Sequence, residues 1–253
     1  MKIGMTSLTL GGYTPAQVIT VAKEAGIQGI EWGVSEGHMA LKDAQRAQII
    51  RKLSQESGIE IFSLGAYCYM EDREECDQVL ETAVLLGAPV IRIWAGTKPP
   101  CECEESYKDL IAKNTFYMAE RAVKRGIKLG FEYHPWTLTE TAEDAVDLIK
   151  RVNHPSVALY WQPSGGLSIE KNVHNRNLVL PMCVGNIHVQ NYSSTAGYGL
   201  LSEIRERLEV YFGDIRHEDY HVMIEFVKDG SVENLKADAA ALQEIIGVSR
   251  RHE

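Results

Sequence analysis

Leu86-Gly87-Ala88-Pro89-Val90-Ile91-Arg92-Ile93 joins the end of a predicted helix to a short apolar strand through one glycine, and this pattern indicates how the chain folds. Glycine suits the residue after a helix, since that position often requires a positive φ. The same arrangement recurs at three other places, each followed at once by an apolar strand: Glu24-Ala25-Gly26-Ile27, Glu56-Ser57-Gly58-Ile59 and Arg125-Gly126-Ile127. The repeat predicts a chain of alternating helices and strands.

The spacing of the predicted strands is about 30 to 40 residues, the length of one βα unit. We expect strands at 3–5, 30–32, 61–64, 90–93, 129–132, 157–160, 185–189 and 221–226, and a last helix over about 229–246. Dividing 253 residues by these eight strands gives roughly 32 per unit. The sequence therefore predicts an α/β fold, a single (β/α)8 TIM barrel over residues 1–253. A doubly wound sheet is the alternative, but its G-x-G-x-x-G fingerprint is absent.

The composition is that of an ordinary globular protein, with 45% apolar and 24% charged residues. The chain has no apolar run long enough to cross a bilayer and no signal peptide at its start, so we expect a cytoplasmic protein without a membrane partner. A net charge of −9 opposes nucleic-acid binding. The cysteines are odd in number and form no C-x-x-C pair, which favours free thiols: Cys68, Cys76, Cys101, Cys103 and Cys183.

Alternate residues of a strand point to opposite sides, so each predicted strand has two sets of side chains. One set is uniformly apolar and is expected to face the helices. The other set is polar and is expected to point into the barrel: Glu31, Arg92, Trp94, Glu132, His134, Tyr160, Gln162, Asn186, His188, Gln190, His221 and Glu225. Three long irregular stretches, 95–105, 162–177 and 190–200, follow strands, where a barrel carries its functional loops.

A polar barrel interior is costly unless its groups pair or hold a ligand. One interpretation is a set of buried ion pairs, for instance Arg92 with Glu31. The other is a metal site, because two glutamates, a histidine and an amide converge from strands five to eight. These residues are Glu132, Gln162, His188 and Glu225. Oxygen ligands with one imidazole suit Mn²⁺, Mg²⁺, Co²⁺ or a catalytic Zn²⁺, so we expect one divalent ion.

All four tryptophans lie near predicted strand ends. Trp32 and Trp161 have outward parity and are expected to fill space between strands and helices. Trp94 has inward parity and is the better candidate for a wall of the ligand site. Trp136 follows the fifth strand.

The strand sequences resemble those of the xylose isomerase-like TIM barrels over the whole chain. The motifs that carry the resemblance are Ile30-Glu31-Trp32-Gly33, Ile91-Arg92-Ile93-Trp94-Ala95-Gly96, Phe131-Glu132-Tyr133-His134, Asn186-Ile187-His188-Val189 and Ile224-Glu225-Phe226. That group includes sugar and sugar-phosphate isomerases and epimerases, ketose 3-epimerases, inosose dehydratase and endonuclease IV.

The resemblance to ketose 3-epimerases implies a metal held by Glu132, His188 and Glu225. Gln162 stands where those enzymes have an aspartate, so the site has one negative charge fewer. Gly165 stands where they have a substrate-binding histidine.

The resemblance also implies the chemistry, a metal-dependent sugar or sugar-phosphate isomerase or epimerase. Glu132 and Glu225 would transfer a proton next to a carbonyl through a cis-enediolate. The expected substrate-binding residues are Glu31, Arg92, Trp94, His134 and Gln190.

Several alternatives share this barrel. An inosose-type dehydratase would begin with the same proton abstraction, and a barrel that binds a sugar without turnover is also compatible with Gln162. A nuclease resembling endonuclease IV is disfavoured by the charge and by too few histidines at strand ends. The expected partner is a small sugar or polyol, with no nucleic acid, and the chain is compatible with a homodimer or homotetramer.

Overall fold

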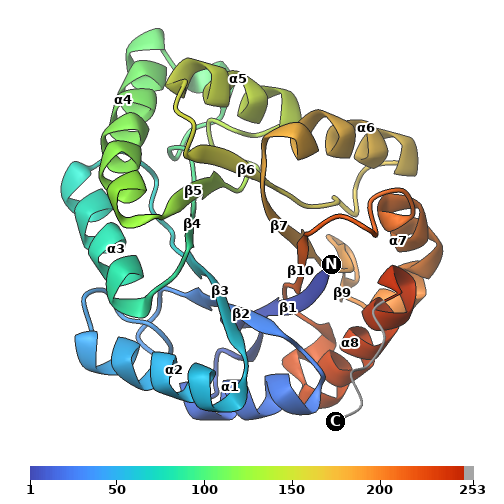
Figure 1. The fold of residues 1–253 in the computed structure, drawn as a ribbon. Coiled ribbons are helices and arrows are strands. Elements are labelled where there is room, and N and C mark those ends of the chain that lie inside the picture. Colours follow the sequence, from blue (N-terminus) through green and yellow to red (C-terminus); the bar gives the residue numbers. More distant parts are fainter. Residues whose placement is uncertain (248–253) are drawn as a thin grey trace.

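The computed structural model describes residues 1–247, so residues 248–253 of the predicted domain lie outside the described part of the chain. Eight parallel strands form a closed barrel, in the order β1-β2-β3-β4-β5-β6-β7-β10 around the ring (Figure 1). The strands are β1 Lys2–Thr6, β2 Gly29–Gly33, β3 Glu60–Gly65, β4 Val90–Ile93, β5 Lys128–Phe131, β6 Val157–Trp161, β7 Cys183–Val189 and β10 His221–Ile224.

Helices surround the barrel on the outside (Figure 1). Within residues 1–247 they are α1 Pro15–Glu24, α2 Ala44–Ser57, α3 Arg73–Leu86, α4 Glu105–Ala122, α5 Ala142–Val152, α6 Ile169–Val179, α7 Arg205–Phe212 and α8 Val232–Ile246. The predicted (β/α)8 barrel is therefore confirmed. In this part of the chain, no helix combines the length and the apolar character that a membrane span requires.

Glycine ends the helices as the sequence predicts. Gly58 and Gly87 are the left-handed C-terminal caps of α2 and α3, with φ of 75° and 74°. The helix starts are equally legible, because Thr14 forms a capping box before Pro15 and Thr141 does the same before α5. Local sequence thus sets where these elements begin and end.

The irregular stretches and the last helix differ in detail from the prediction. Helix α6 begins at Ile169, inside the stretch 162–177, where Ser168 caps it; the helix was missed because its sequence is mostly polar. The stretch 190–200 contains a short antiparallel pair, β8 Tyr192–Ser193 and β9 Gly197–Tyr198. Helix α8 starts at Val232 rather than near 229, because Ser231 is its N-cap.

The core has two parts, one outside the strands and one inside the barrel. Outward side chains of the strands pack against the helices, and both Trp32 and Trp161 are fully buried there, as predicted. Inside the barrel a smaller cluster of Phe62, Tyr160 and Met223 fills the end where the strands begin. The Phe62 ring stacks on His221 with centroids 3.8 Å apart.

All five cysteines lie within residues 1–247, and each is a free thiol in this part of the chain. Cys68 and Cys76 are buried with their Sγ atoms 4.0 Å apart.

Candidate functional site

Five of the polar side chains expected inside the barrel lie together within it. Glu31, Arg92 and His188 lie on β2, β4 and β7, whereas Glu132 and Glu225 directly follow β5 and β10. Because all eight strands are parallel, their carboxyl ends form a common rim. In TIM barrels this rim carries the functional residues.

Arg92 joins two carboxylates in the interior. Its Nε donates to Glu31 Oε1 at 2.8 Å and its Nη1 donates to Glu132 Oε2 at 2.7 Å. The exposed fractions of the Arg92, Glu31 and Glu132 side chains are 3%, 1% and 3%. The ion pair that the sequence suggested is present, and the same guanidinium also holds Glu132. Charge-assisted bonds of this kind fix both carboxylates in position.

Gly65 makes room for this arrangement. A Cβ on Gly65 would lie 2.6 Å from Glu31 Oε1 and 2.8 Å from Arg92 Nη2, which is closer than real Cβ contacts. The other oxygen of Glu31, Oε2, accepts hydrogen bonds from Ser63 Oγ at 2.7 Å and from the Tyr160 hydroxyl at 3.0 Å. Both oxygens of Glu31 are therefore engaged by the protein.

His188 lies between the three glutamates. Its Nδ1 is 3.5 Å from Glu132 Oε1 and 3.7 Å from Glu225 Oε2, and its Nε2 is 3.5 Å from Glu31 Oε1. These are ion-pair distances, too long for good hydrogen bonds. The ring is buried, and neither nitrogen has a hydrogen-bond partner among residues 1–247.

This arrangement fits a divalent ion. One ligand atom from each of Glu132, His188 and Glu225 lies within 4.8 Å of the other two. Donors around an ion at 2.0–2.2 Å are separated by about 3 Å when adjacent and about 4 Å when opposite. Nδ1 of His188 faces both carboxylates and is the ring nitrogen placed to bind an ion there. Two oxygens and one imidazole nitrogen form a donor set typical of Mg²⁺, Mn²⁺ or catalytic Zn²⁺.

The two carboxylates that contact Arg92 are held ionised. Burial raises the pKa of Glu31, but the charges of His188 and Arg92 outweigh it and lower that pKa to about 2. Burial likewise raises the pKa of Glu132, and Arg92 and His188 bring it well below its usual range. Burial lowers the pKa of Arg92, but Glu132 and Glu31 keep it above its usual value.

Glu225 has different electrostatics. Burial raises its pKa, and the repulsion of Glu132 and Glu31 adds to this against the attraction of His188 and Arg92, for a value of about 7. Burial lowers the pKa of His188, but Glu225, Glu31 and Glu132 raise it to about 10. Without a metal, the site therefore holds protons on His188 and, below neutral pH, on Glu225.

Gln162 directly follows β6, as its predicted position requires. Its Nε2 donates to the Tyr133 carbonyl at 3.4 Å, and Tyr133 donates from its hydroxyl to the Gln162 carbonyl at 3.1 Å. The side-chain oxygen Oε1 is buried and has no hydrogen-bond partner in the described part of the chain. An unpaired buried oxygen is available as a ligand, and the metal role of Gln162 stays a prediction.

Trp94 supports the site through its edge. Its Nε1 donates to Glu132 Oε2 at 2.8 Å. The His134 ring stacks on Trp94 with centroids 4.4 Å apart, and Tyr67 and Tyr69 meet it edge-on. Trp94 is thus part of a cluster of rings, and its role as a wall of the ligand site stays a prediction.

His134 and Gln190 are also at the rim. His134 Nδ1 lies 3.0 Å from the Pro135 carbonyl, which can only accept, so Nδ1 is the donor of this hydrogen bond. Gln190 Nε2 donates to Glu225 Oε2 at 3.3 Å. The substrate-binding roles of both residues stay predictions.

The sequence does not indicate Ser63 or Tyr67 as site residues. For Tyr160 and Asn186 it predicts the inward direction of the side chain but no role. Strand β3 has a register shift opposite Ile30 and Glu31, which places Ser63 beside Glu31. A bulge of this kind breaks the simple alternation on which the parity argument depends. For Tyr160 the available signal was Gly130 on the neighbouring strand, where a Cβ would lie 2.5 Å from the Tyr160 ring.

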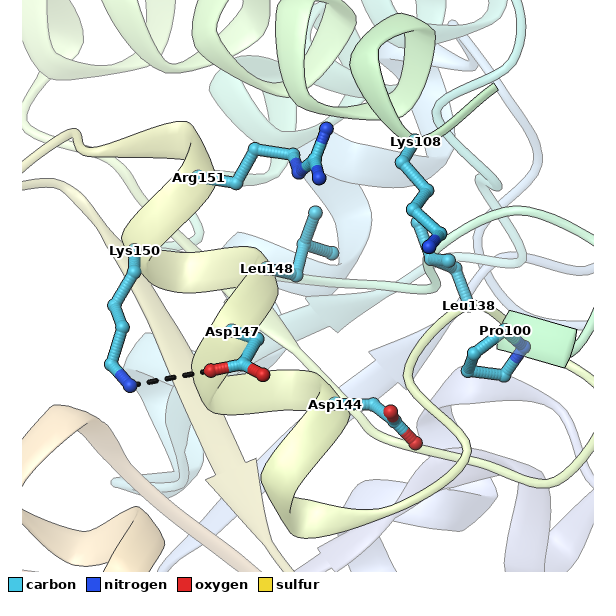
Figure 2. Close-up of a pocket in the computed structure, with 8 residues that line it drawn as sticks. All are labelled: Pro100, Lys108, Leu138, Asp144, Asp147, Leu148, Lys150 and Arg151. Atoms are coloured by element: carbon cyan, nitrogen blue, oxygen red, sulfur yellow. Dashed lines mark hydrogen bonds and ion pairs between the residues drawn. The ribbon is translucent and has the colours of Figure 1, made fainter. Parts of the chain in front are cut away.

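A separate hollow of about 550 Å³ lies between α4 and α5 (Figure 2). Lys150 pairs with Asp147 at 3.2 Å, and Arg151 pairs with Glu105 and Asp109. None of the inward polar residues lines it; the lining is Pro100, Lys108, Leu138, Asp144, Asp147, Leu148, Lys150 and Arg151. Its charges are thus largely satisfied within the surface.

The chain is similar in sequence to an enzyme of known activity. A 3-dehydroshikimate dehydratase of Bacillus anthracis is 21% identical over 150 residues, which are 56% of this chain and 54% of the relative. The match thus spans about half the length of that enzyme.

Three solved structures share the fold. A probable 3-DHS dehydratase from Bacillus anthracis has a TM-score of 0.76 and 19% identity, covering 96% of this chain and 99% of the other. The D-allulose 3-epimerase of Methylomonas sp. has a TM-score of 0.72 and 14% identity, with coverages of 97% and 98%. A Mycobacterium smegmatis barrel in complex with magnesium has a TM-score of 0.66 and 19% identity, with coverages of 97% and 96%.

The family model described as a xylose isomerase-like TIM barrel matches residues 19–230, most of the closed barrel. The resemblance seen in the strand motifs is thereby confirmed. The chain belongs to the xylose isomerase-like TIM barrel family.

Proposed function

We propose that this protein is a metal-dependent lyase that removes water from a small polyhydroxylated carbonyl compound. The proposed metal ligands are Glu132, His188 and Glu225, with Gln162 as the fourth. The proposal departs from the isomerase that the resemblance first suggested, and the dehydratase relative supports the change.

The observation that carries the proposal is the unequal bonding of the two carboxylates. Glu132 Oε2 accepts two short bonds, from Arg92 at 2.7 Å and Trp94 at 2.8 Å. Glu225 accepts one longer bond, from Gln190 at 3.3 Å, and its side chain is 13% exposed. Glu132 is tightly held, whereas Glu225 is free to exchange a proton. A site with one mobile base suits elimination better than epimerisation, which requires a proton donor and acceptor on opposite faces.

A divalent ion bound at the site would polarise the carbonyl of the substrate. Glu225 takes the proton from the carbon next to that carbonyl. The electron pair of the broken C–H bond forms a C=C bond, and the hydroxyl on the following carbon leaves with the electrons of its C–O bond. Glu225 returns the proton to this hydroxide, which departs as water, so atoms and charge balance. His134 and Gln190 are the rim residues proposed to orient hydroxyl groups.

The second candidate is a sugar epimerase, which one contact favours. Glu132 Oε1 faces His188 at 3.5 Å, on the same nitrogen that Glu225 approaches at 3.7 Å. Two carboxylates beside one bound substrate are the minimum for proton transfer on two faces. In this alternative Glu132 returns the proton that Glu225 removes.

The deciding experiment supplies Mn²⁺-loaded protein with 3-dehydroshikimate or D-allulose in D₂O. We expect loss of one water from a substrate, detected by mass spectrometry. Glu225→Gln should lower kcat by about 10² to 10⁴-fold, the usual contribution of a positioned acid–base group. Glu120→Gln is the matched control, because Glu120 is 51% exposed and contacts His154 outside the rim.

The outcomes separate the two candidates. A product that loses no water and gains deuterium at the exchanged carbon, absent in both Glu132→Gln and Glu225→Gln, would establish the epimerase and overturn the lyase. Absence of exchange and of water loss with every substrate would contradict both and favour a barrel that binds without turnover.

A further inference from the structure

Glu31 has contacts that do not suit a substrate-binding residue. Its side chain is 1% exposed, and its oxygens are occupied by Arg92, Ser63 and Tyr160. A hydroxyl of a substrate would have to displace one of these buried partners. These contacts favour a role for Glu31 in holding neighbouring side chains rather than in binding substrate.

The contact that remains is with His188. Glu31 Oε1 lies 3.5 Å from His188 Nε2, which is within ion-pair distance. The opposite ring nitrogen, Nδ1, faces Glu132 and Glu225. Nδ1 of the ring is therefore directed to Glu132 and Glu225, the other proposed ligands. Nε2 is directed to Glu31, which is not a proposed ligand.

We infer that Glu31 is a positioning residue that keeps the proton of His188 on Nε2, so that Nδ1 is free to bind the metal ion. The inference rests on the metal site of the proposed function. A histidine ligand usually donates its second ring N–H to a carboxylate or carbonyl, which sets the tautomer and the ring orientation.

A chain of hydrogen bonds reaches Glu31 from the end of the barrel where the strands begin. His221 Nδ1 donates to Asn186 Oδ1 at 3.0 Å, and Asn186 Nδ2 donates to the Tyr160 hydroxyl at 2.7 Å. Tyr160 then donates to Glu31 Oε2 at 3.0 Å. Every donor points towards Glu31, which leaves it in the acceptor state that a donating Nε2–H requires.

The neighbouring guanidinium strengthens the argument. Arg92 Nε donates to the same oxygen, Oε1, that faces His188 Nε2. The carboxylate therefore cannot rotate away from the imidazole without breaking a 2.8 Å bond between buried charges. Breaking one partner of a buried ion pair is strongly unfavourable.

The test uses protein labelled with ¹⁵N-histidine and loaded with Zn²⁺, a diamagnetic probe. We expect the His188 spectrum to show zinc on Nδ1 and a proton on Nε2 that exchanges slowly with water. Glu31→Gln should shift this Nε2–H signal upfield and weaken Zn²⁺ binding by about 10 to 100-fold, the usual effect of losing such a partner.

Ser63→Ala is the matched control. It removes one bond to Oε2 of Glu31 but leaves the carboxylate opposite His188. We expect a lower free energy of unfolding with an unchanged Nε2–H signal and Zn²⁺ affinity within about twofold of the parent, since a lost buried hydrogen bond costs only about 1 kcal/mol.

The outcomes distinguish this inference from the proposed function. Coordination through Nε2, or a Glu31→Gln variant that keeps both the signal and the affinity, would overturn the role of Glu31 while the metal site stands. Equal loss of affinity in Ser63→Ala would reduce Glu31 to a structural residue. A parent that binds no Zn²⁺ at His188 would overturn the metal site and this inference together.

Discussion

Glu132 and Glu225 carry the same functional group in different surroundings. Arg92 and Trp94 both donate to one oxygen of Glu132, whereas within the described residues Glu225 receives a single side-chain bond, from Gln190. The sequence gives no sign of this difference, because the donors come from other strands. Side-chain identity thus predicts which atoms are present, and tertiary contacts decide which of them can exchange a proton.

Gln162 provides a residue-scale prediction about the metal. Glu132, His188, Glu225 and an amide give a formal ligand charge of −2. Gln162→Glu and Gln162→Asp add one negative charge and should tighten Mn²⁺ binding by about tenfold, or about 1.4 kcal/mol. Gln162→Leu removes the unpaired oxygen and should weaken binding. Titration calorimetry measures all three.

The control for charge alone is Gln55→Glu, on the exposed side of α2. It adds the same charge outside the barrel and should leave Mn²⁺ affinity unchanged. If every Gln162 variant bound Mn²⁺ as the parent does, Gln162 would not be a ligand.

The pH dependence of metal binding follows from the two raised pKa values. The pKa of His188 is raised to about 10 and that of Glu225 to about 7, so an entering cation must displace these protons. Metal affinity should therefore fall as the pH falls, by about tenfold per pH unit between 7 and 9 and by about 100-fold per unit below 6. Calorimetry in buffers of different ionisation enthalpy counts the released protons.

Glu225→Gln is the informative variant for this pH prediction. It should release one proton fewer below pH 7 while still binding the ion more weakly. A proton count that stays the same in this variant would show that Glu225 is not the group that titrates.

Strand β3 shows, at the scale of one element, where the sequence argument reaches its limit. Ile30 pairs with Ile61, but Glu31 pairs with Ser63, so Phe62 is an extra residue between them. The alternation of side chains cannot be extended through such a bulge. Phe62 and Ser63 therefore both contribute to the interior, and neither could be assigned from parity.

Phe62 yields the prediction for this element. It fills the closed end of the barrel between Gly4, Gly29 and His221. Phe62→Ala should lower the free energy of unfolding by about 3 to 5 kcal/mol, because it leaves a cavity in the core. Urea denaturation followed by circular dichroism measures the change.

Phe116→Ala is the matched control, since Phe116 lies on α4 and is 44% exposed. It should cost much less than Phe62→Ala. Equal destabilisation by the two variants would show that the stacked cluster does not support the barrel.

At the scale of the whole molecule, the sequence predicts features that repeat along the chain, such as helix ends and strand parity. It does not predict which side chains contact each other. Glycines after helices and the two parities of the strands were enough to predict eight βα units and an interior lined by Glu31, Arg92, Glu132 and His188. Which glutamate Arg92 contacts depends on barrel closure and strand register, so the structure was needed to show that it holds two. Helix α6 is not predicted from the sequence for a different reason, because it is mostly polar and has no apolar stripe.

The contact of Gly65 with Glu31 and Arg92 has a consequence for substitutions at position 65. A Cβ there would fall within 2.8 Å of both charged groups, so a larger residue would have to displace their side chains. Because Arg92 also holds Glu132, the displacement would reach that carboxylate too. Positions 31, 65, 92 and 132, far apart in the chain, are therefore one coupled set, in which a change at the glycine disturbs three buried charges.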